Sequence, residues 1–337
     1  VLPEQAAVQL NDTHPAMAVP ELLRVLLDEA HLDWDQAWDI TQRVRAYTNH
    51  TLLPEAMEKW PLRFFKVILP RHLELIKEMD RRFLVQLHEQ YPEDEARCRR
   101  MALIERRGSR RVRMAHLAML GSHSVNGVSR LHSQLLRERV VPDFAELFPE
   151  RFNNKTNGVN PRRWLLQANP ALAQVITEAI GDAWVTDLYQ LERLRALAQD
   201  AGFQADFRRA KSQAKTRFID WLKHETGHTI DPASIFDCQI KRIHEYKRQL
   251  LNALHIVVLY NRLRNQTHPD MPARTFFFAG KAAPAYELAK LVIKLINNIA
   301  AVIAHEPRVR EKLQVVFVPN YNVTVAEHLI AASDVSE

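Results

Sequence analysis

The sequence contains little cysteine, with only Cys98 and Cys238 among 337 residues. Two cysteines so far apart argue against a disulfide framework and a cysteine-rich zinc site, and they fit a reducing cytoplasm. Because no run of about 18 apolar residues occurs, we expect no membrane span. The chain begins at Val1 with no methionine, basic segment or long apolar segment. We therefore expect no secretory signal and interpret the sequence as part of a longer protein.

Several motifs of catalysis and nucleotide binding are also missing. The sequence has no G-x-G-x-x-G and no G-x-x-x-x-G-K-[ST] segment, so it shows neither a dinucleotide fingerprint nor a Walker loop. GSHSVNG, residues 121–127, lacks the residue order of a nucleophile elbow. HETGH, residues 224–228, matches a zinc-protease motif in form. However, Gly227 is a typical helix terminator, so the two histidines would not share one continuing helix, and we expect no metal site.

The composition is that of a globular protein, with 47% hydrophobic and 26% charged residues. The length exceeds that of most single hydrophobic cores, which predicts two domains. Asn, Thr, Gly and Pro accumulate in NNKTNGVNPRRW, residues 153–164, so we place the domains at 1–157 and 158–337. The net charge of +6 fits an anionic partner, but it also fits a solvated basic surface.

The first part of the chain, to about residue 150, has mainly helical patterns after a short strand at 6–10. Pro20 is expected at the first position of one helix, and Asp33 with Gln36 forms a capping pattern for the next. Residues 70–91 predict a long amphipathic helix. Its expected buried stripe is Leu73, Ile76, Phe83 and Leu87.

The second part of the chain predicts alternating strands and helices. Continuous apolar runs begin at residues 235, 275 and 313, and helical patterns fill 245–264 and 284–305. Strand–helix–strand units at this spacing are typical of a parallel sheet with helices on both faces. Apolar runs without alternation fit strands that are covered on both sides. This half is therefore expected to be Rossmann-like.

Positive charge follows the first of these strands in KRIHEYKRQ, residues 241–249. Ligands of open α/β sheets gather at the carboxyl ends of strands, where the following helix also directs its amides. Lys241 and Arg242 leave the strand, and Lys247 is expected about one turn into the helix, so together they could hold one or two phosphates. The alternative is a solvated helix face. A nucleic-acid groove is less favoured, because no aromatic residues interleave with the basic ones.

Two further strand ends carry similar side chains. Gly280 and Lys281 follow the second strand, and Tyr286 is expected to be exposed where a helix begins near Pro284. Tyr321 follows the third strand. Three neighbouring strand ends would then present Lys, Arg and Tyr toward one crevice, which favours an anion site over a solvated surface.

Five segments resemble the α-glucan phosphorylases in the same order and almost without gaps: QLNDTHPAMAVPELLRVL, AYTNHTLLPEA, NKTNGVNPRRW, KRIHEYKRQLLN and GKAAP. The resemblance implies a GT-B α/β fold, in which two Rossmann-like domains face each other across a cleft. This chain would hold the end of the first domain, which is mainly helical, and the start of the second. The implied reaction is phosphorolysis of α-1,4-glucans by inorganic phosphate, which releases glucose 1-phosphate with retention. Pyridoxal phosphate would act through its phosphate as proton donor and acceptor. A cytoplasmic homodimer without nucleic-acid or membrane partners is implied as well.

The same resemblance implies roles for individual residues. Lys241 would contact the cofactor phosphate, and Arg242 and Lys247 would hold the substrate phosphate. Trp164 and Tyr321 would lie near the pyridoxal ring. The residues expected to bind glucan are Asp12, His14 and Tyr286 on the acceptor path, and Asn157 with the backbone of His50 at the terminal glucose. Each of these has a plainer alternative as a turn or surface residue.

Two features depart from the family pattern. No lysine matches the Schiff-base position, which we expect after Glu337, and a glycine-rich phosphate loop is expected before Val1, so the chain alone should be inactive. Arg106 stands where animal enzymes with a glycogen storage site carry an acidic residue. With RRGSRR, residues 106–111, it indicates an unregulated bacterial maltodextrin phosphorylase. The alternatives are a nucleotide-sugar glycosyltransferase of GT-B fold and a non-catalytic glucan- or anion-binding module.

Overall fold

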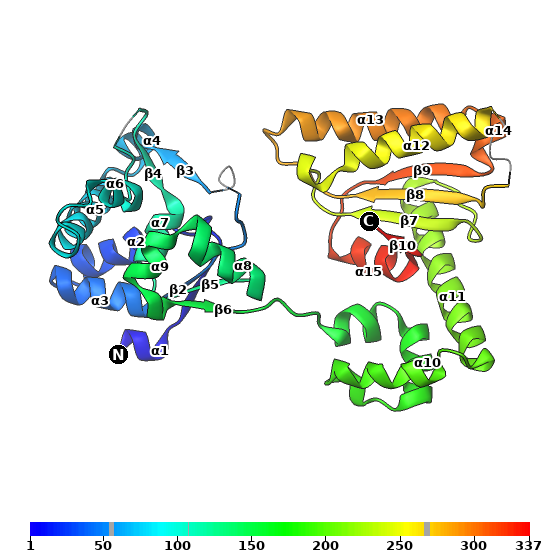
Figure 1. The fold of residues 1–337 in the computed structure, drawn as a ribbon, viewed down its shortest axis with the longest axis horizontal. Helices are drawn as coiled ribbons and strands as arrows, with labels where there is room; N and C mark the ends of the chain where they lie inside the picture. The colour runs from blue at the N-terminus through cyan, green and yellow to red at the C-terminus, as the bar shows by residue number, and fades with distance from the viewer. Residues whose placement is uncertain (54–56, 107, 266–269) are drawn as a thin grey trace. The chain divides into compact units, whose positions relative to one another are not determined.

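The computed structural model describes residues 1–53, 57–106, 108–265 and 270–337. The chain divides into two compact units, Val1–Gly158 and Val159–Glu337 (Figure 1). Each unit has its own four-stranded parallel sheet and its own buried cores. None of the described helices is both long enough and apolar enough to cross a membrane. Parallel sheets in a mixed α/β chain agree with the predicted fold class, whereas the assignment of the units to two GT-B domains stays a prediction.

The sheet of the first unit runs in the order β1-β2-β5-β6, with all neighbours parallel. Its strands are β1 Val8–Asn11, β2 Arg45–Thr48, β5 Ser124–Gly127 and β6 Phe152–Asn154. One row across the sheet consists of Leu10, Tyr47, Val125 and Phe152, all buried. Only the first strand was predicted from the sequence. The other three were missed because runs of three or four residues are too short to show a period.

Helices surround this sheet, and a two-stranded antiparallel sheet joins β3 Lys59–Pro61 to β4 Arg111–Arg113. The helices are α1 Leu2–Gln5, α2 Ala18–Arg24, α3 Trp34–Val44, α4 Leu62–Ile68, α5 Pro70–Gln90, α6 Glu95–Met101, α7 Met114–Leu120, α8 Arg130–Leu135 and α9 Pro142–Leu147. The carboxylate of Asp33 accepts a hydrogen bond from the amide of Gln36 at 2.9 Å, so the predicted cap of α3 is confirmed. The predicted start of α2 was wrong: the helix begins at Ala18, and Pro20 is its third residue.

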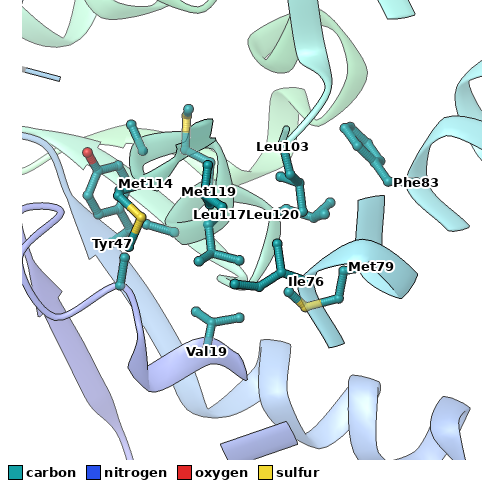
Figure 2. Close-up of a cluster of buried hydrophobic side chains, with 14 of the residues drawn as sticks. Val19, Tyr47, Ile76, Met79, Phe83, Leu103, Met114, Leu117, Met119 and Leu120 are labelled. Atoms are coloured by element: carbon teal, nitrogen blue, oxygen red, sulfur yellow. The ribbon is translucent and has the colours of Figure 1, made fainter. Parts of the chain in front are cut away.

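Helix α5 supplies much of the first unit's core. All four residues of its predicted stripe, from Leu73 to Leu87, are buried. Figure 2 shows Ile76, Met79 and Phe83 of α5 in one buried cluster with Leu117 and Leu120 of α7. Phe83 also stacks on Phe144 of α9, with ring centroids 5.8 Å apart. The predicted amphipathic helix is therefore confirmed as a core element.

The sheet of the second unit runs in the order β10-β7-β8-β9, and all its strands are parallel. The strands are β7 Ile235–Ile240, β8 Arg274–Ala279, β9 Leu313–Val318 and β10 Val335–Ser336. The three apolar runs are thus confirmed as adjacent parallel strands. Phe276 and Phe278 belong to one core cluster and Phe277 to another, as the alternation of side chains along β8 requires. The sheet is therefore covered on both faces, as predicted.

Helices α12 and α13 cover one face of this sheet, and α11 and α15 cover the other (Figure 1). The helices of the unit are α10 Pro170–Ile180, α11 Ala201–Thr226, α12 Gln249–Arg264, α13 Glu287–Ala304, α14 Pro307–Arg310 and α15 Val323–Ala332. Gly227 caps the C-terminus of α11 with φ of 78°, as its sequence position predicted. The predicted first residues of two helices were wrong: α12 begins four residues later than expected, and α13 begins three residues later.

Candidate functional site

The basic loop, residues 241–248, leaves the carboxyl end of β7 and stays beside the end of β8. The amide of Lys241 donates to the carbonyl of Ala279 at 3.0 Å, and the amide of Ile243 donates to that of Lys281 at 3.1 Å. Gly280 makes this approach possible. A Cβ atom at Gly280 would lie 2.0 Å from the carbonyl oxygen of Lys241, and its φ is +155°. The sequence thus brings the two strand ends together through a residue without a side chain.

The conformation of the basic loop corrects the predicted place of Lys247. Residues Glu245–Lys247 form a short 3-10 turn, and Arg248 has a left-handed φ of 60°. Helix α12 begins only at Gln249. Lys247 therefore lies before the helix and not one turn inside it. A residue in the left-handed region interrupts helical geometry, so the loop is a separate structure.

Buried amide side chains hold the backbone of the basic loop. Gln249, with 1% of its surface exposed, donates from Nε2 to the carbonyl of Arg242 at 3.0 Å and accepts from the amide of His244 at 3.3 Å. Gln239 donates to the carbonyl of Lys247 at 2.9 Å and accepts from Asn252 at 3.2 Å. We call Gln239, Gln249 and Asn252 the amide cradle. Its contacts fix the carbonyls of the two residues that were predicted to hold substrate phosphate.

The positive charges of the basic loop are not neutralised by carboxylates of the described residues. Within the described parts of the chain, Lys241, Arg242 and Lys247 have no carboxylate at ion-pair distance. The ammonium group of Lys247 lies 4.7 Å from the ring centroid of Tyr246. Glu245, the one acid of the loop, accepts a hydrogen bond from the hydroxyl of Tyr286. Three cations on a fixed backbone therefore form an arrangement that suits a phosphate anion.

The other predicted residues of this unit lie on neighbouring elements. Tyr286 is half-buried, with its ring 5.1 Å from that of His244, so the prediction that it would be exposed was wrong. Tyr321 packs against the core cluster that includes Phe236 and Cys238, and burial raises the pKa of its phenol. Trp164 lies on a separate π-helical turn, Arg162–Gln167. The structure thus brings Tyr286 to the basic loop. Tyr321 follows β9, which is separated from β7 by β8.

The glucan residues predicted in the first unit all follow strands at one edge of its parallel sheet. Asp12 comes after β1 with a left-handed φ of 70°, and its amide donates to Thr48 at the end of β2. The ring Nε2 of His50 is hydrogen-bonded to Asn11. The amide of Asn157 donates to the carbonyl of Val128 at 2.9 Å. Carboxyl ends of parallel strands are where open α/β sheets bind ligands.

Three residues that the sequence did not single out support this edge. Asn49, with 1% of its surface exposed, accepts from Nε2 of His132 at 3.1 Å, and the other ring nitrogen of His132 accepts from the amide of Val128 at 3.0 Å. Burial lowers the pKa of His132, which favours the neutral ring. Glu58 accepts from the hydroxyl of Thr13 at 2.6 Å and lies 3.5 Å from His14. Asn49 lies within AYTNHTLLPEA, one of the five segments that resemble the phosphorylases. No pattern in the sequence pointed to His132 or Glu58.

Comparison with known proteins places the chain in a family. The family model described as carbohydrate phosphorylase matches residues 1–337. The chain belongs to the carbohydrate phosphorylase family. It is 50% identical over 335 residues to the muscle form of glycogen phosphorylase from Mus musculus, covering 99% of this chain and 40% of that protein. The muscle form from Homo sapiens is 49% identical and the brain form from Mus musculus is 50% identical, with the same coverage.

The family resemblance drawn from five sequence segments is therefore confirmed. The phosphorylase chain spans about 40% of the length of these curated relatives, so it corresponds to an internal segment of such a protein. Two sets of residues offer groups of different chemistry. The cations of the basic loop, which have no carboxylate partner among the described residues, suit phosphate groups. The polar edge of the first unit offers hydroxyl, imidazole and amide groups of the kind that bind sugar hydroxyls.

Proposed function

We propose that this chain is part of an α-1,4-glucan phosphorylase, which uses inorganic phosphate to release glucose 1-phosphate with retained configuration. The observation that carries the proposal is the basic loop, in which Lys241, Arg242 and Lys247 lie without carboxylate partners among the described residues. Membership of the carbohydrate phosphorylase family supports it. The basic segment around Arg106 supports a preference for short linear maltodextrins over glycogen.

The chemistry requires substrate phosphate to bind beside a second phosphate, that of pyridoxal phosphate. Two unit charges about 5 Å apart, at an effective dielectric constant of about 20, repel by about 3 kcal/mol. Cations held before the substrate arrives offset this repulsion without reorganisation during the reaction. Arg242 and Lys247 hold the substrate phosphate, because the amide cradle fixes their backbone carbonyls. Lys241, at the end of β7, would bind the cofactor phosphate.

The cofactor, when bound, supplies a phosphate group that exchanges a proton with the substrate phosphate. Trp164 and Tyr321 would lie near its ring. This chain's own contribution is to hold the substrate phosphate close to the glycosidic bond. There the anion stabilises the positive charge that develops on the anomeric carbon of the terminal glucose as its glycosidic bond breaks.

The glucan is bound by the strand ends of the first unit. Asn157 and the backbone of His50 bind the terminal glucose, and Asp12 and His14 line the acceptor path. Asn49 and Glu58 are positioning residues here, since they bind the loops that carry His50 and His14. Neutral amide and imidazole groups recognise sugar hydroxyls by paired hydrogen bonds.

The test is kinetic and uses the full-length enzyme. Arg242→Ala should lower kcat/KM for phosphate by about 10- to 100-fold, the cost of losing one charged hydrogen bond. Pyridoxal content, read from absorbance, should stay unchanged. Arg264→Ala, at the far end of α12, removes an exposed arginine as a matched control. Unchanged phosphate kinetics in Arg242→Ala would remove the arginine from this role.

The alternative enzyme, a nucleotide-sugar glycosyltransferase, receives no support from the family match or the relatives. A direct assay separates the two. Full-length protein should form glucose 1-phosphate from maltoheptaose and phosphate, and should not transfer glucose from a nucleotide sugar. If neither reaction occurs and no pyridoxal absorbance is present, the non-catalytic binding module becomes the better description.

A further inference from the structure

A second basic site lies in the first unit, where helix α6 and strand β4 wall a cavity of about 570 Å³. We call it the arginine pocket. Its charged lining is Arg99, Arg100, Arg106, Arg111, Arg113 and Glu105. None of these residues belongs to the basic loop or to the proposed glucan edge. A cavity of this size is in the range of small-molecule sites.

The secondary structure explains why so many arginines line one cavity. Ala96, Arg99 and Arg100 are three and four positions apart on α6 and therefore share a face of the helix. On β4, Val112 is buried, so Arg111 and Arg113 project from the opposite face of the strand. The small side chain of Ala96 leaves space between these two arginine-bearing walls.

The carboxylates near the pocket do not use all of its donors. A guanidinium group has five N–H donors. Arg111 binds Glu105 through Nε at 2.7 Å and through Nη2, and Arg100 binds Asp143 in the same side-on manner. Each arginine therefore keeps Nη1 free of its carboxylate. Glu105 is also held by Lys59 at 3.0 Å, so the only acid in the lining already has two cationic partners.

Two other arginines of the pocket are less well paired with carboxylates of the described residues. Arg99 lies 3.8 Å from Glu95, beyond hydrogen-bonding distance. Arg113 donates from Nη1 to the carbonyls of Arg99, Arg100 and Ala102, at 3.0, 2.9 and 2.9 Å, and has no carboxylate partner in the described ranges. Burial lowers the pKa of Arg113, which shows that its charge is poorly solvated. A bound anion would compensate that charge.

We propose that the arginine pocket binds a small ligand carrying two or more phosphate groups. Guanidinium groups match phosphate oxygens by paired, charge-assisted hydrogen bonds, and they pay less desolvation than ammonium groups. Several arginines on two walls of a cavity of about 570 Å³ can engage more than one phosphate at a time. This inference concerns a separate site and does not rest on the proposed glucan chemistry.

The test measures binding of inorganic tripolyphosphate to the full-length protein by isothermal titration calorimetry. Arg242→Ala with Lys247→Ala serves as the background, so that heat from the basic loop does not enter the measurement. Arg99→Gln and, separately, Arg111→Gln should each weaken binding about tenfold. Arg110→Gln changes an exposed arginine that does not line the pocket, and it should leave the affinity unchanged.

Two results would overturn the proposal. One is the absence of measurable binding in the background protein at millimolar tripolyphosphate. The other is an equal loss of affinity in Arg110→Gln and Arg99→Gln, which would mean that general surface charge attracts the anion. Arg99→Gln removes an exposed side chain, and its melting curve checks that it folds. Arg111→Gln gives a second, independent reading from the other wall.

Discussion

Gln249 offers the sharpest test of how the basic loop is held. Its amide binds two backbone groups of the loop, the carbonyl of Arg242 and the amide of His244. Gln249→Met keeps the length and approximate volume of the side chain but removes both hydrogen bonds. Leaving such backbone groups unpaired costs about 1–3 kcal/mol. Because the loop borders solvent, water molecules can bind some of the unpaired groups, which reduces this free-energy cost.

Both hydrogen bonds of Gln249 hold the basic loop, so their loss should mainly affect phosphate binding. A loss of about 1–2 kcal/mol in loop order corresponds to a phosphate KM raised by about 5- to 30-fold. The KM for glucan should change less than the KM for phosphate. Gln249 contacts none of the first-unit residues proposed to bind glucan, and it is linked to Tyr286 indirectly, through His244. Gln249→Glu should weaken phosphate binding further, because the carboxylate cannot donate to Arg242 and places negative charge beneath the loop.

Steady-state kinetics of the full-length enzyme with varied phosphate, and separately with varied maltoheptaose, give the two KM values. Gln174→Met, an exposed substitution on α10, controls for the change of residue type. A merely structural role for Gln249 would reduce the active fraction and leave both KM values as they were. That outcome, with a lowered melting temperature, would refute the idea that the amide cradle positions Arg242.

Two further substitutions test other parts of the structure. Gly280→Ala would place a Cβ atom 2.0 Å from the Lys241 carbonyl, so we expect a cost of about 3 kcal/mol or more, read as a lowered denaturant midpoint; a normal midpoint would show that the strand ends separate easily. Desolvation lowers the pKa of His116 to about 4. The unfolded chain then takes up a proton as pH falls below about 6.5, and the folded protein loses about 1.4 kcal/mol per unit down to about pH 4. His116→Gln should flatten this part of the stability profile, and an unchanged slope would exclude His116 as its source.

The sequence predicts some of these elements well for a physical reason. The strands β7, β8 and β9 are six residues long and covered on both sides, so their apolar runs are continuous and easily recognised. Helix α5 is long enough for its stripe to repeat several times. The strands β2, β5 and β6 have only three or four residues and no visible period. Their existence depends on pairing with neighbours distant in the sequence, which a local pattern cannot show.

The residues of the candidate site also differ in how readily the sequence predicts them. The cations of the basic loop are conspicuous in the sequence because charge directly follows an apolar run. The amide cradle is not, since Gln239 fits a strand end and Gln249 fits a helix that the pattern started too early. His132 and Glu58 lie 83 and 45 residues from Asn49 and Thr13, the groups they bind. Contacts between such distant positions follow from the tertiary structure alone.

The chemistry of the cradle explains why amides and not acids lie under the basic loop. A carboxylate at position 239 or 249 would accept hydrogen bonds, but it would also pair with a lysine or arginine above it and neutralise the charge that a phosphate needs. An amide donates to a backbone carbonyl and stays neutral, so it fixes the loop and leaves the cations unpaired. In the first unit, Asn49 and His132 likewise hold the carboxyl ends of the strands, whereas Glu58 places a carboxyl group beside Thr13 and His14. In the basic loop, rigidity thus comes from groups that add no charge of their own.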